Sequence, residues 1–194
     1  MFSLEVEQGL ALRLLQTDNA EELFALVDRN RDHLREWLSW LDLINSVSDS
    51  RRFIERALQH YADRRALHAG IHRQDALAGV IAFNHIDRNR GQARIGYWLA
   101  AACQGQGLAT RACRAMTEHA IAGMGMGRVE IACAESNGKS RSIPERLGYR
   151  ETGYVHRAEW LYDHYVHHVV YSMSADDWQR RCRQFGASPG EPSP

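Results

Sequence analysis

The sequence predicts an α+β fold in which a mixed, mostly antiparallel sheet of about seven strands is flanked by about four helices. Short segments of alternating apolar residues lie close together in the chain, which predicts antiparallel hairpins. Longer segments carry an apolar stripe at helical spacing and predict helices that cover the sheet. A whole helix separates residues 93–100 from the strand-like residues 128–134, so these two strands should run parallel and splay the sheet at a ligand site.

Composition indicates one cytoplasmic domain with balanced charge. The 194 residues include 24 basic and 24 acidic side chains, which gives no general attraction to nucleic acid. No apolar run reaches the roughly 18 residues of a membrane span, and the N-terminus lacks a signal-peptide pattern. We therefore expect a single domain over residues 1–185, a disordered tail over residues 186–194, and no membrane partner. Four cysteines without C-x-x-C spacing indicate reduced thiols; we interpret all four as bystanders, and Cys113 and Cys133 as small core residues.

Two helices are expected in the first third of the chain, after a short strand at residues 10–15. Asp18 and Glu21 have the spacing of a capping box, which would open a helix that ends near Asn30. Asp49 or Ser48 would cap a second helix, whose apolar stripe predicts one buried face.

Two tryptophans three residues apart stand between these helices, in a polar and interrupted segment. Tryptophans that are not fully buried often line binding grooves, so Trp37 and Trp40 are candidates for substrate contact. They could equally cap the core beneath a loop.

Three strands at residues 66–72, 77–86 and 93–100 form an antiparallel meander, because only turn-like residues separate them. A helix with an apolar face follows from Leu108 to about Ile121, and Gly123 can end it.

Strand 128–134 leads directly into Asn137-Gly138-Lys139-Ser140 and a helix that Gly148 ends. Pro144 leaves two alternatives for this helix: it starts near Gly138 and is disturbed, or it starts later with Ser142 and Glu145 as a capping box. We favour the second. A closing hairpin over residues 149–160 and 165–173 and a short helix around Trp178 complete the fold.

The glycine turn between strand 93–99 and its helix has the order of an anion cradle. Gly105 and Gly107 let the backbone bend so that N–H groups point into one concavity, and the following helix adds unpaired donors and partial positive charge. A P-loop or a Rossmann fingerprint would need residues that are absent here. A mere tight connection between strand and helix is the competing interpretation.

These motifs together resemble those of the GNAT N-acetyltransferases. The turn is similar to the family's Gln/Arg-x-x-Gly-x-Gly/Ala acetyl-coenzyme A motif. Residues 95–99 before it, residues 30–40 near the start, Asn137-x-x-Ser140 and residues 147–149 resemble the branch that acetylates ribosomal-protein N-termini. The similarity runs from about Leu10 to Met173. It implies the GNAT fold, acetyl-CoA as cosubstrate, and a homodimer for which the C-terminal hairpin is the candidate interface.

The resemblance also implies roles at the donor site. Main-chain groups of Trp98 and Leu99 and the side chain of Asn137 would hold the pantetheine arm. The pyrophosphate would be bound by backbone amides of Gln104, Gly105, Gln106, Gly107, Leu108, Ala109 and Thr110.

For the reaction, the resemblance implies direct acetyl transfer to an amine, with Glu159 as the general base and Ser140 as the group that protonates the thiolate. Trp160 beside Glu159 would desolvate it and raise its pKa. Ser140 has an alternative role as a helix cap, and Glu159 as an ordinary strand carboxylate.

Other polar residues are weaker candidates. Asn84 and His85 end a central strand and would contact the acceptor, with a structural role as the alternative. We expect no metal site, because His164 and His168 share one strand face and His167 the other; these histidines and Asp163 would instead line the acceptor groove. Arg88 and Arg90 flank a turn, where a solvated hairpin is expected rather than a docking site for an acidic protein.

Three functions compete. The first is acetylation of a protein N-terminus, most simply that of a ribosomal protein. The second is acetylation of a small-molecule or aminoacyl-antibiotic amine, in detoxification or self-immunity. The third is coenzyme A binding without turnover.

Overall fold

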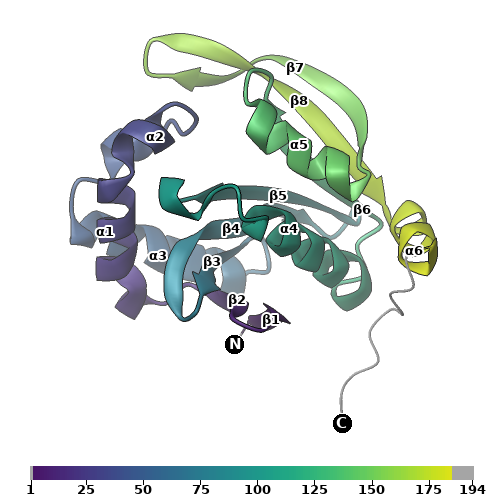
Figure 1. Cartoon of the computed structure of the whole chain (residues 1–194), viewed down its shortest axis with the longest axis horizontal. Coiled ribbons are helices and arrows are strands. Elements are labelled where there is room, and N and C mark those ends of the chain that lie inside the picture. The colour runs from purple at the N-terminus through teal and green to yellow at the C-terminus, as the bar shows by residue number, and fades with distance from the viewer. Residues whose placement is uncertain (1, 185–194) are drawn as a thin grey trace.

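The structure, a computed structural model, describes residues 2–184 and has one eight-stranded sheet (Figure 1). The strand order is β1-β2-β3-β4-β5-β6-β8-β7, and every neighbouring pair is antiparallel except β5 and β6. The strands are β1 (Ser3–Glu7), β2 (Leu10–Leu14), β3 (Leu67–Arg73), β4 (Ala76–Asp87), β5 (Gln92–Leu99), β6 (Arg128–Ala134), β7 (Arg150–Leu161) and β8 (His164–Ser174). The predicted α+β class is thus confirmed; the expected tail lies outside the described residues.

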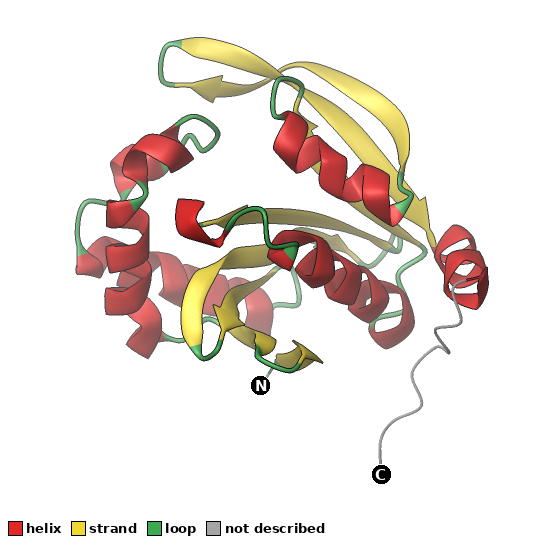
Figure 2. Cartoon of the chain, viewed as in Figure 1, coloured by secondary structure: helices red, strands yellow, loops and turns green. Residues whose placement is uncertain are grey.

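Helices cover both faces of the sheet (Figure 2). They are α1 (Ala20–Arg29), α2 (Arg31–Arg35), α3 (Val47–Ala62), α4 (Leu108–Glu118), α5 (Gly138–Leu147) and α6 (Ala175–Gln184). On β4, the successive residues Val80 and Ile81 enter different cores: Val80 packs with α1 and α3, and Ile81 with α4. The sheet therefore separates a core under α1 and α3 from a larger one under α4 and α5.

Two elements were missing from the sequence prediction, β1 and α2. Each has only five residues, so neither shows a full repeat of its apolar period. β1 is an edge strand that pairs with β2, and its Leu4 and Val6 pack against the larger core. α2 has Leu34 as its one buried residue.

The predicted splay between β5 and β6 is present. Their parallel pairing covers only Gln92 to Ile95 and Arg128 to Ile131. Beyond it, β5 continues beside β4 to Leu99, while β6 continues beside β8 to Ala134. The two strands diverge without further pairing, which exposes backbone at the centre of the sheet.

Both predicted helix caps in the first third are wrong. Asp18 lies in a 3-10 turn, η1 (Thr17–Asn19), ahead of α1, where Asn19 Oδ1 accepts the backbone N–H of Gln16 at 2.9 Å. In α3 the cap is Ser46, whose hydroxyl accepts the N–H of Asp49 at 3.2 Å. More than one residue that could cap stands near the start of each helix, and spacing alone did not identify the one that does.

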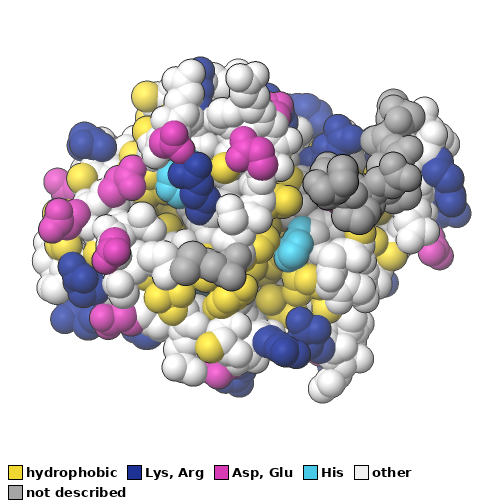
Figure 3. Space-filling model, turned by 90° about the horizontal axis from the view of Figure 1, so that it is seen from below, with side chains coloured by type: hydrophobic (Ala, Val, Ile, Leu, Met, Phe, Trp, Pro, Cys, Tyr) yellow, Lys and Arg dark blue, Asp and Glu magenta, His cyan; other side chains and the backbone are white. Residues whose placement is uncertain are grey.

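Surface charge is mixed. The face seen in Figure 3 carries both basic and acidic side chains around an apolar area, in keeping with a formal net charge of zero. Within residues 2–184, no helix combines the length and apolarity needed to cross a membrane.

One histidine makes stability depend on pH. His68 on β3 packs edge-on against Phe53 of α3, with ring centroids 5.4 Å apart, and its Nδ1 atom is buried without a partner among the described residues. Burial lowers the pKa of His68 from 6.5 to about 4, and nearby His60 adds to the effect.

We predict that the free energy of unfolding falls by about 2 kcal/mol between pH 7.5 and pH 5 because of His68. The depressed pKa means that the unfolded chain takes up the proton first. The stability of the folded protein with neutral His68 is therefore undiminished above pH 6.5, and it decreases as the pH falls toward 4. Urea unfolding of the wild type and of His68→Leu at both pH values measures it; equal pH slopes in the two proteins would contradict it.

Candidate active site

A cavity of about 850 Å³ opens where β5 and β6 diverge. Its walls come from the segment after α1, the end of β5, the glycine turn with the start of α4, and the start of α5. The predicted site residues that line it are Trp37, Trp98, Leu99, Gln104, Gly105, Gly107, Leu108, Ala109, Thr110, Asn137 and Ser140. Residues far apart in the chain are thus brought together as predicted.

The glycine turn has the backbone geometry of an anion cradle. Gly105 and Gly107 have φ values of 73° and 72°, in the left-handed region that glycine adopts without strain. Gly107 is the N-cap of α4, so the N–H groups of Leu108 and Ala109 begin the helix without intrahelical acceptors. Gln106 does not line the cavity; its side chain donates to the Ala102 carbonyl at 3.1 Å.

α5 begins at Gly138 and contains Pro144, so the later start that the sequence favoured is wrong. Asn137 is the cap: its Oδ1 accepts the N–H of Ser140 at 3.0 Å. Pro144 has no N–H for the Ser140 carbonyl, and the Tyr97 hydroxyl of β5 donates to that carbonyl instead, at 2.9 Å. A side chain from the sheet thereby replaces the missing helical hydrogen bond.

The Ser140 hydroxyl does not cap the helix and lies in a partly buried group of polar side chains. It is 3.3 Å from both the Tyr97 hydroxyl and the Cys133 thiol, and can donate to either. Burial raises the pKa values of Tyr97 and Cys133, so both stay protonated at neutral pH. Cys133 is buried, as predicted, and its thiol contacts the hydroxyl of Ser140.

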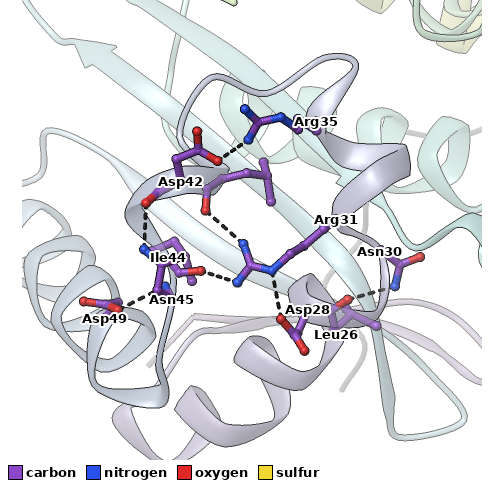
Figure 4. Close-up of polar contacts among 10 residues, drawn as sticks. Leu26, Asp28, Asn30, Arg31, Arg35, Asp42, Ile44, Asn45 and Asp49 are labelled. Atoms are coloured by element: carbon purple, nitrogen blue, oxygen red, sulfur yellow. Dashed lines mark hydrogen bonds and ion pairs between the residues drawn. The ribbon is translucent and has the colours of Figure 1, made fainter. Parts of the chain in front are cut away.

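The segment from Asn30 to Ile44 forms the outer wall, and side chains of the segment hold it through bonds to carbonyls and carboxylates (Figure 4). Arg31 donates to the carbonyls of Leu41 and Ile44 and to Asp28. Asn30 accepts the N–H of Ala101 at 2.9 Å, just ahead of the glycine turn. Asn30 and Arg31, two residues of the 30–40 pattern that carries the family resemblance, therefore hold the outer wall in place.

The same segment contacts both sides of the cavity. The side-chain amide of Gln104 donates to His33 Nε2 at 2.7 Å, which joins α2 to the cradle. At the other side, the Tyr162 hydroxyl of the β7–β8 turn donates to the Leu38 carbonyl at 2.5 Å, and Arg35 stacks on the Tyr162 ring.

Glu159 and its partner Ser39 lie outside the cavity lining, although Ser39 stands next to Leu38 of the outer wall. The Oε1 atom of Glu159 accepts the hydroxyl of Ser39 at 2.5 Å, and the Oε2 atom is 3.5 Å from His168 Nε2 on β8. The bond to His168 contributes most to lowering the pKa of Glu159, and Ser39 adds to it. The expected rise in pKa through Trp160 is wrong, since Trp160 is 49% exposed and packs on Tyr165 instead.

A bulge in β7 sets the position of Glu159. Between the pairs Val155–His168 and Glu159–Val166, β7 advances four residues while β8 advances two. Arg157 within the bulge has a φ of 49°, unusual for a residue with a side chain. Bulges of this kind redirect side chains, and this one brings Glu159 diagonally opposite His168.

The other residues predicted to contact the acceptor lie outside the cavity lining. Trp40 does not line the cavity; its ring is 6.3 Å from Trp98 and it caps the core under α1 and α3. Asn84 and His85 are exposed on β4 and also lie outside the cavity lining, with Asn84 against Gly96 of β5.

The histidines of the last hairpin form no metal site. No group of three or more metal-ligating side chains occurs in the part of the chain that is described. His164 is 61% exposed at the hairpin turn and binds Asp163 at 2.6 Å. His167 accepts the N–H of Arg157 within the bulge.

Several site residues escaped the sequence prediction. Lys139 and Arg146 of α5 add positive charge to the lining, and Arg146 donates to Thr110 on α4 at 3.1 Å. Tyr97 and Ser39 carry no motif of their own, and each stands next to a tryptophan with a stronger sequence signal, Trp98 and Trp40. Pro144 was the available signal for Tyr97, since the carbonyl that the proline leaves unpaired requires a donor from elsewhere.

Comparisons with known proteins all find acetyltransferases. The family model described as "Acetyltransferase (GNAT) domain" matches residues 10–150. The putative ribosomal N-acetyltransferase YdaF of Bacillus subtilis (strain 168) is 34% identical over 182 residues, which are 92% of this chain and 98% of that protein.

Two solved structures are similar along nearly their whole length. The ribosomal L7/L12 alpha-N-protein acetyltransferase RimL, in complex with coenzyme A, has a TM-score of 0.87 and 27% identity, covering 91% of this chain and 99% of that one. The microcin C7 self-immunity acetyltransferase MccE, in complex with acetyl-CoA and AMP, has a TM-score of 0.84 and 31% identity, covering 88% and 95%.

We predict that Tyr97→Phe lowers the free energy of unfolding by about 1–2 kcal/mol, because the Ser140 carbonyl loses its donor. In a Pro144→Ala background the same change should cost less, since the introduced alanine would restore the N–H within the helix. Urea unfolding of the four proteins in this cycle measures the coupling. Equal costs of Tyr97→Phe in both backgrounds would show that the tyrosine does not replace the missing bond.

Proposed function

Because the chain belongs to the GNAT acetyltransferase family, we propose that it transfers acetyl from acetyl-CoA to the N-terminal α-amine of a protein, with a ribosomal protein as acceptor. The observation that carries the proposal is the Glu159 carboxylate, held by Ser39 on the wall that continues from the donor cavity. A carboxylate there would attract an N-terminal ammonium and accept its proton.

The cavity fits the donor of this family. GNAT acetyltransferases use acetyl-CoA, whose bound form occurs in the MccE structure. We assign its pyrophosphate to the amides from Gln104 to Thr110, beside Lys139 and Arg146. The main chain of Trp98 and Leu99, unpaired toward β6, would bind the pantetheine amides. Asn137 would donate through its side-chain nitrogen, since its oxygen caps α5.

The proposed reaction involves two protons, one that leaves the acceptor amine and one that is offered to the departing thiolate. An N-terminal amine has a pKa near 8, so it must lose a proton before it can attack the thioester carbonyl. Glu159 accepts that proton while a carbon–nitrogen bond forms and the carbon–sulfur bond breaks. The Ser140 hydroxyl, which is not used in the helix cap, donates to the departing thiolate.

A second candidate is a small-molecule amine. The MccE neighbour, with 31% identity, was solved with acetyl-CoA and AMP, and it confers self-immunity. Trp37 and Trp98 in the lining offer flat apolar surfaces that a nucleobase or other ring could contact. The names of YdaF and RimL favour the protein acceptor.

The homodimer expected from the resemblance and the cytoplasmic location expected from the composition remain predictions. The edge strand β7 carries the exposed side chains of Tyr154, Val155 and Trp160, which a second copy would cover. Sedimentation equilibrium of the purified chain tests the dimer.

We predict that the protein acetylates peptides that start with serine and carry a ribosomal-protein N-terminal sequence. Glu159→Gln should lower kcat by about 100-fold or more, because the amine loses its proton acceptor. Its affinity for acetyl-CoA should stay the same. Thiol release gives the rates, and mass spectrometry gives the acetylated product.

The control is a set of small amines and aminoacyl nucleotides assayed in parallel. Fast thiol release with these compounds and none with peptides would contradict the protein acceptor and favour a small-molecule amine. Full activity in Glu159→Gln would remove Glu159 from the mechanism.

The cradle yields a separate prediction: Gly107→Val should weaken acetyl-CoA binding at least tenfold, because a β-branched residue opposes a φ of 72° and its Cβ would lie 2.7 Å from Arg111 Nη1. Gly125→Val is the matched control, since Gly125 has a φ of 70° but lies outside the cavity lining. Titration calorimetry compares the two. Normal affinity in Gly107→Val would place the pyrophosphate elsewhere.

A further inference from the structure

The second half of the sheet is packed on one side only. Among the described residues, the core under α1 and α3 includes none from β6, β7 or β8. The buried residues of β6 and β8, such as Ile131 and Tyr171, belong to the larger core with α4, α5 and Trp178 of α6. Alternate residues of these strands therefore point to the other side, which we call the open face. It includes residues 94 and 96 of β5, 130 and 132 of β6, and 168, 170 and 172 of β8.

The open face connects the proposed base to an ion pair across three strands. Arg94 of β5 and Glu130 of β6 are paired in register, and Arg94 Nη2 lies 3.0 Å from Glu130 Oε2. Glu130 is in turn paired with Ser172 of β8. Four residues away on β8, and on the same side of the strand, His168 lies 3.5 Å from Glu159. The open face therefore begins beside Glu159 and continues to Arg94.

The floor between these two ends consists of small side chains. Gly96, Ala132 and Val170 are all half-buried. The Asn84 side chain lies directly over Gly96, since a Cβ on that glycine would be 2.2 Å from Asn84 Nδ2. Within residues 2–184 this side-chain amide makes no hydrogen bond. An amide both donates and accepts, so it suits the backbone of an extended peptide that lies on the floor.

The two ends of the open face carry opposite charge. Glu159 supplies a carboxylate at one end. At the other end, the side chain of Arg94 is 51% exposed and that of Glu130 only 11%, so the guanidinium rather than the carboxylate faces water. Arg94 uses Nη2 for Glu130 and keeps further N–H donors free. Arg128, two residues before Glu130, is exposed and makes no ion pair with any described residue. This end therefore favours a carboxylate.

We propose that the open face binds the N-terminal segment of the acceptor protein in an extended conformation, and that Arg94 binds an acidic side chain of this segment. The proposal rests on the proposed function, in which Glu159 receives the proton of the terminal amine. A surface that continues from Glu159 across three strands fits a polypeptide, whereas a small amine would end beside the carboxylate.

Strand spacing predicts which residue of the acceptor reaches Arg94. The four residues from His168 to Ser172 span about 13 Å, and the two strand spacings from Ser172 to Arg94 add about 10 Å at right angles. The diagonal is about 16 Å, and an extended peptide covers about 3.3 Å per residue. The acidic side chain should therefore stand at roughly the fourth to the sixth position of the acceptor.

The test compares serine-starting peptides that carry aspartate or lysine at the fifth position. We expect kcat/KM of the wild type to be at least fivefold higher for the aspartate peptide, through a lower KM, and the ratio to fall to about one in Arg94→Gln. Arg13→Gln is the matched control and should keep the wild-type ratio, because Arg13 pairs with Asp75 in the other half of the sheet. KM for acetyl-CoA should be the same in all three proteins.

A second variant and a shorter substrate separate binding from folding. Asn84→Ala leaves the ion pair between Arg94 and Glu130 intact, and it should raise KM for both long peptides about threefold. A peptide of two residues is too short to reach Asn84 or Arg94. Its KM should be higher than that of the aspartate peptide in the wild type, and neither Arg94→Gln nor Asn84→Ala should change its acetylation.

The outcomes distinguish this proposal from the proposed function. Equal kcat/KM of the wild type for the two long peptides, an unchanged ratio in Arg94→Gln, or an equally low KM for the two-residue peptide would overturn the peptide surface and leave the reaction standing. A lower mass of Arg94→Gln than of the wild type in sedimentation equilibrium would assign the open face to a second copy and also overturn it. If the wild type acetylates no serine-starting peptide of either length, the proposed function itself fails.

Discussion

The early divergence of β5 from β6 is the constraint on which the site depends. After four paired residues on each strand, β5 keeps β4 as its neighbour and β6 keeps β8. The gap leaves strand backbone facing a cavity instead of another strand, and backbone polar groups without partners are costly unless a ligand or water satisfies them. An extended ligand with amide groups can lie between the strands as a substitute for the missing pairs. The cradle, α5 and the outer wall all stand around this one break in the ladder.

A proline contributes to the same site in an unexpected way. Pro144 removes one hydrogen bond from α5, and Tyr97 on β5 supplies it from across the gap. The bond joins the helix that bears Ser140 to the strand that bears Trp98 and Leu99. A local defect in a helix thus becomes a tertiary link between two walls of the donor cavity.

Much of the fold and the geometry of the cavity around the glycine turn could be predicted from the sequence, because their signals are local. The positive φ values at Gly105 and Gly107 follow from residue type and order, and the parallel pairing follows from the helix between two strands. The acceptor half could not be predicted in the same way. The environment of Glu159 depends on Ser39, 120 residues away, and on a bulge whose extra residues have no glycine to mark them. Its pKa was therefore expected to shift in the wrong direction.

The segment from Asn30 to Ile44 is fastened by a few of its own groups: the Arg31 side chain donates to the Leu41 and Ile44 carbonyls, the Leu38 carbonyl accepts from Tyr162, and the Asn30 side chain accepts the N–H of Ala101. The side chain of Trp37 takes part in none of these bonds, so an exchange at Trp37 should leave the course of the wall and the cradle opposite undisturbed. Ser39 differs, because its hydroxyl holds Glu159. Two solved structures similar to this chain have names that point to different roles, one a ribosomal-protein acetyltransferase and the other a self-immunity acetyltransferase.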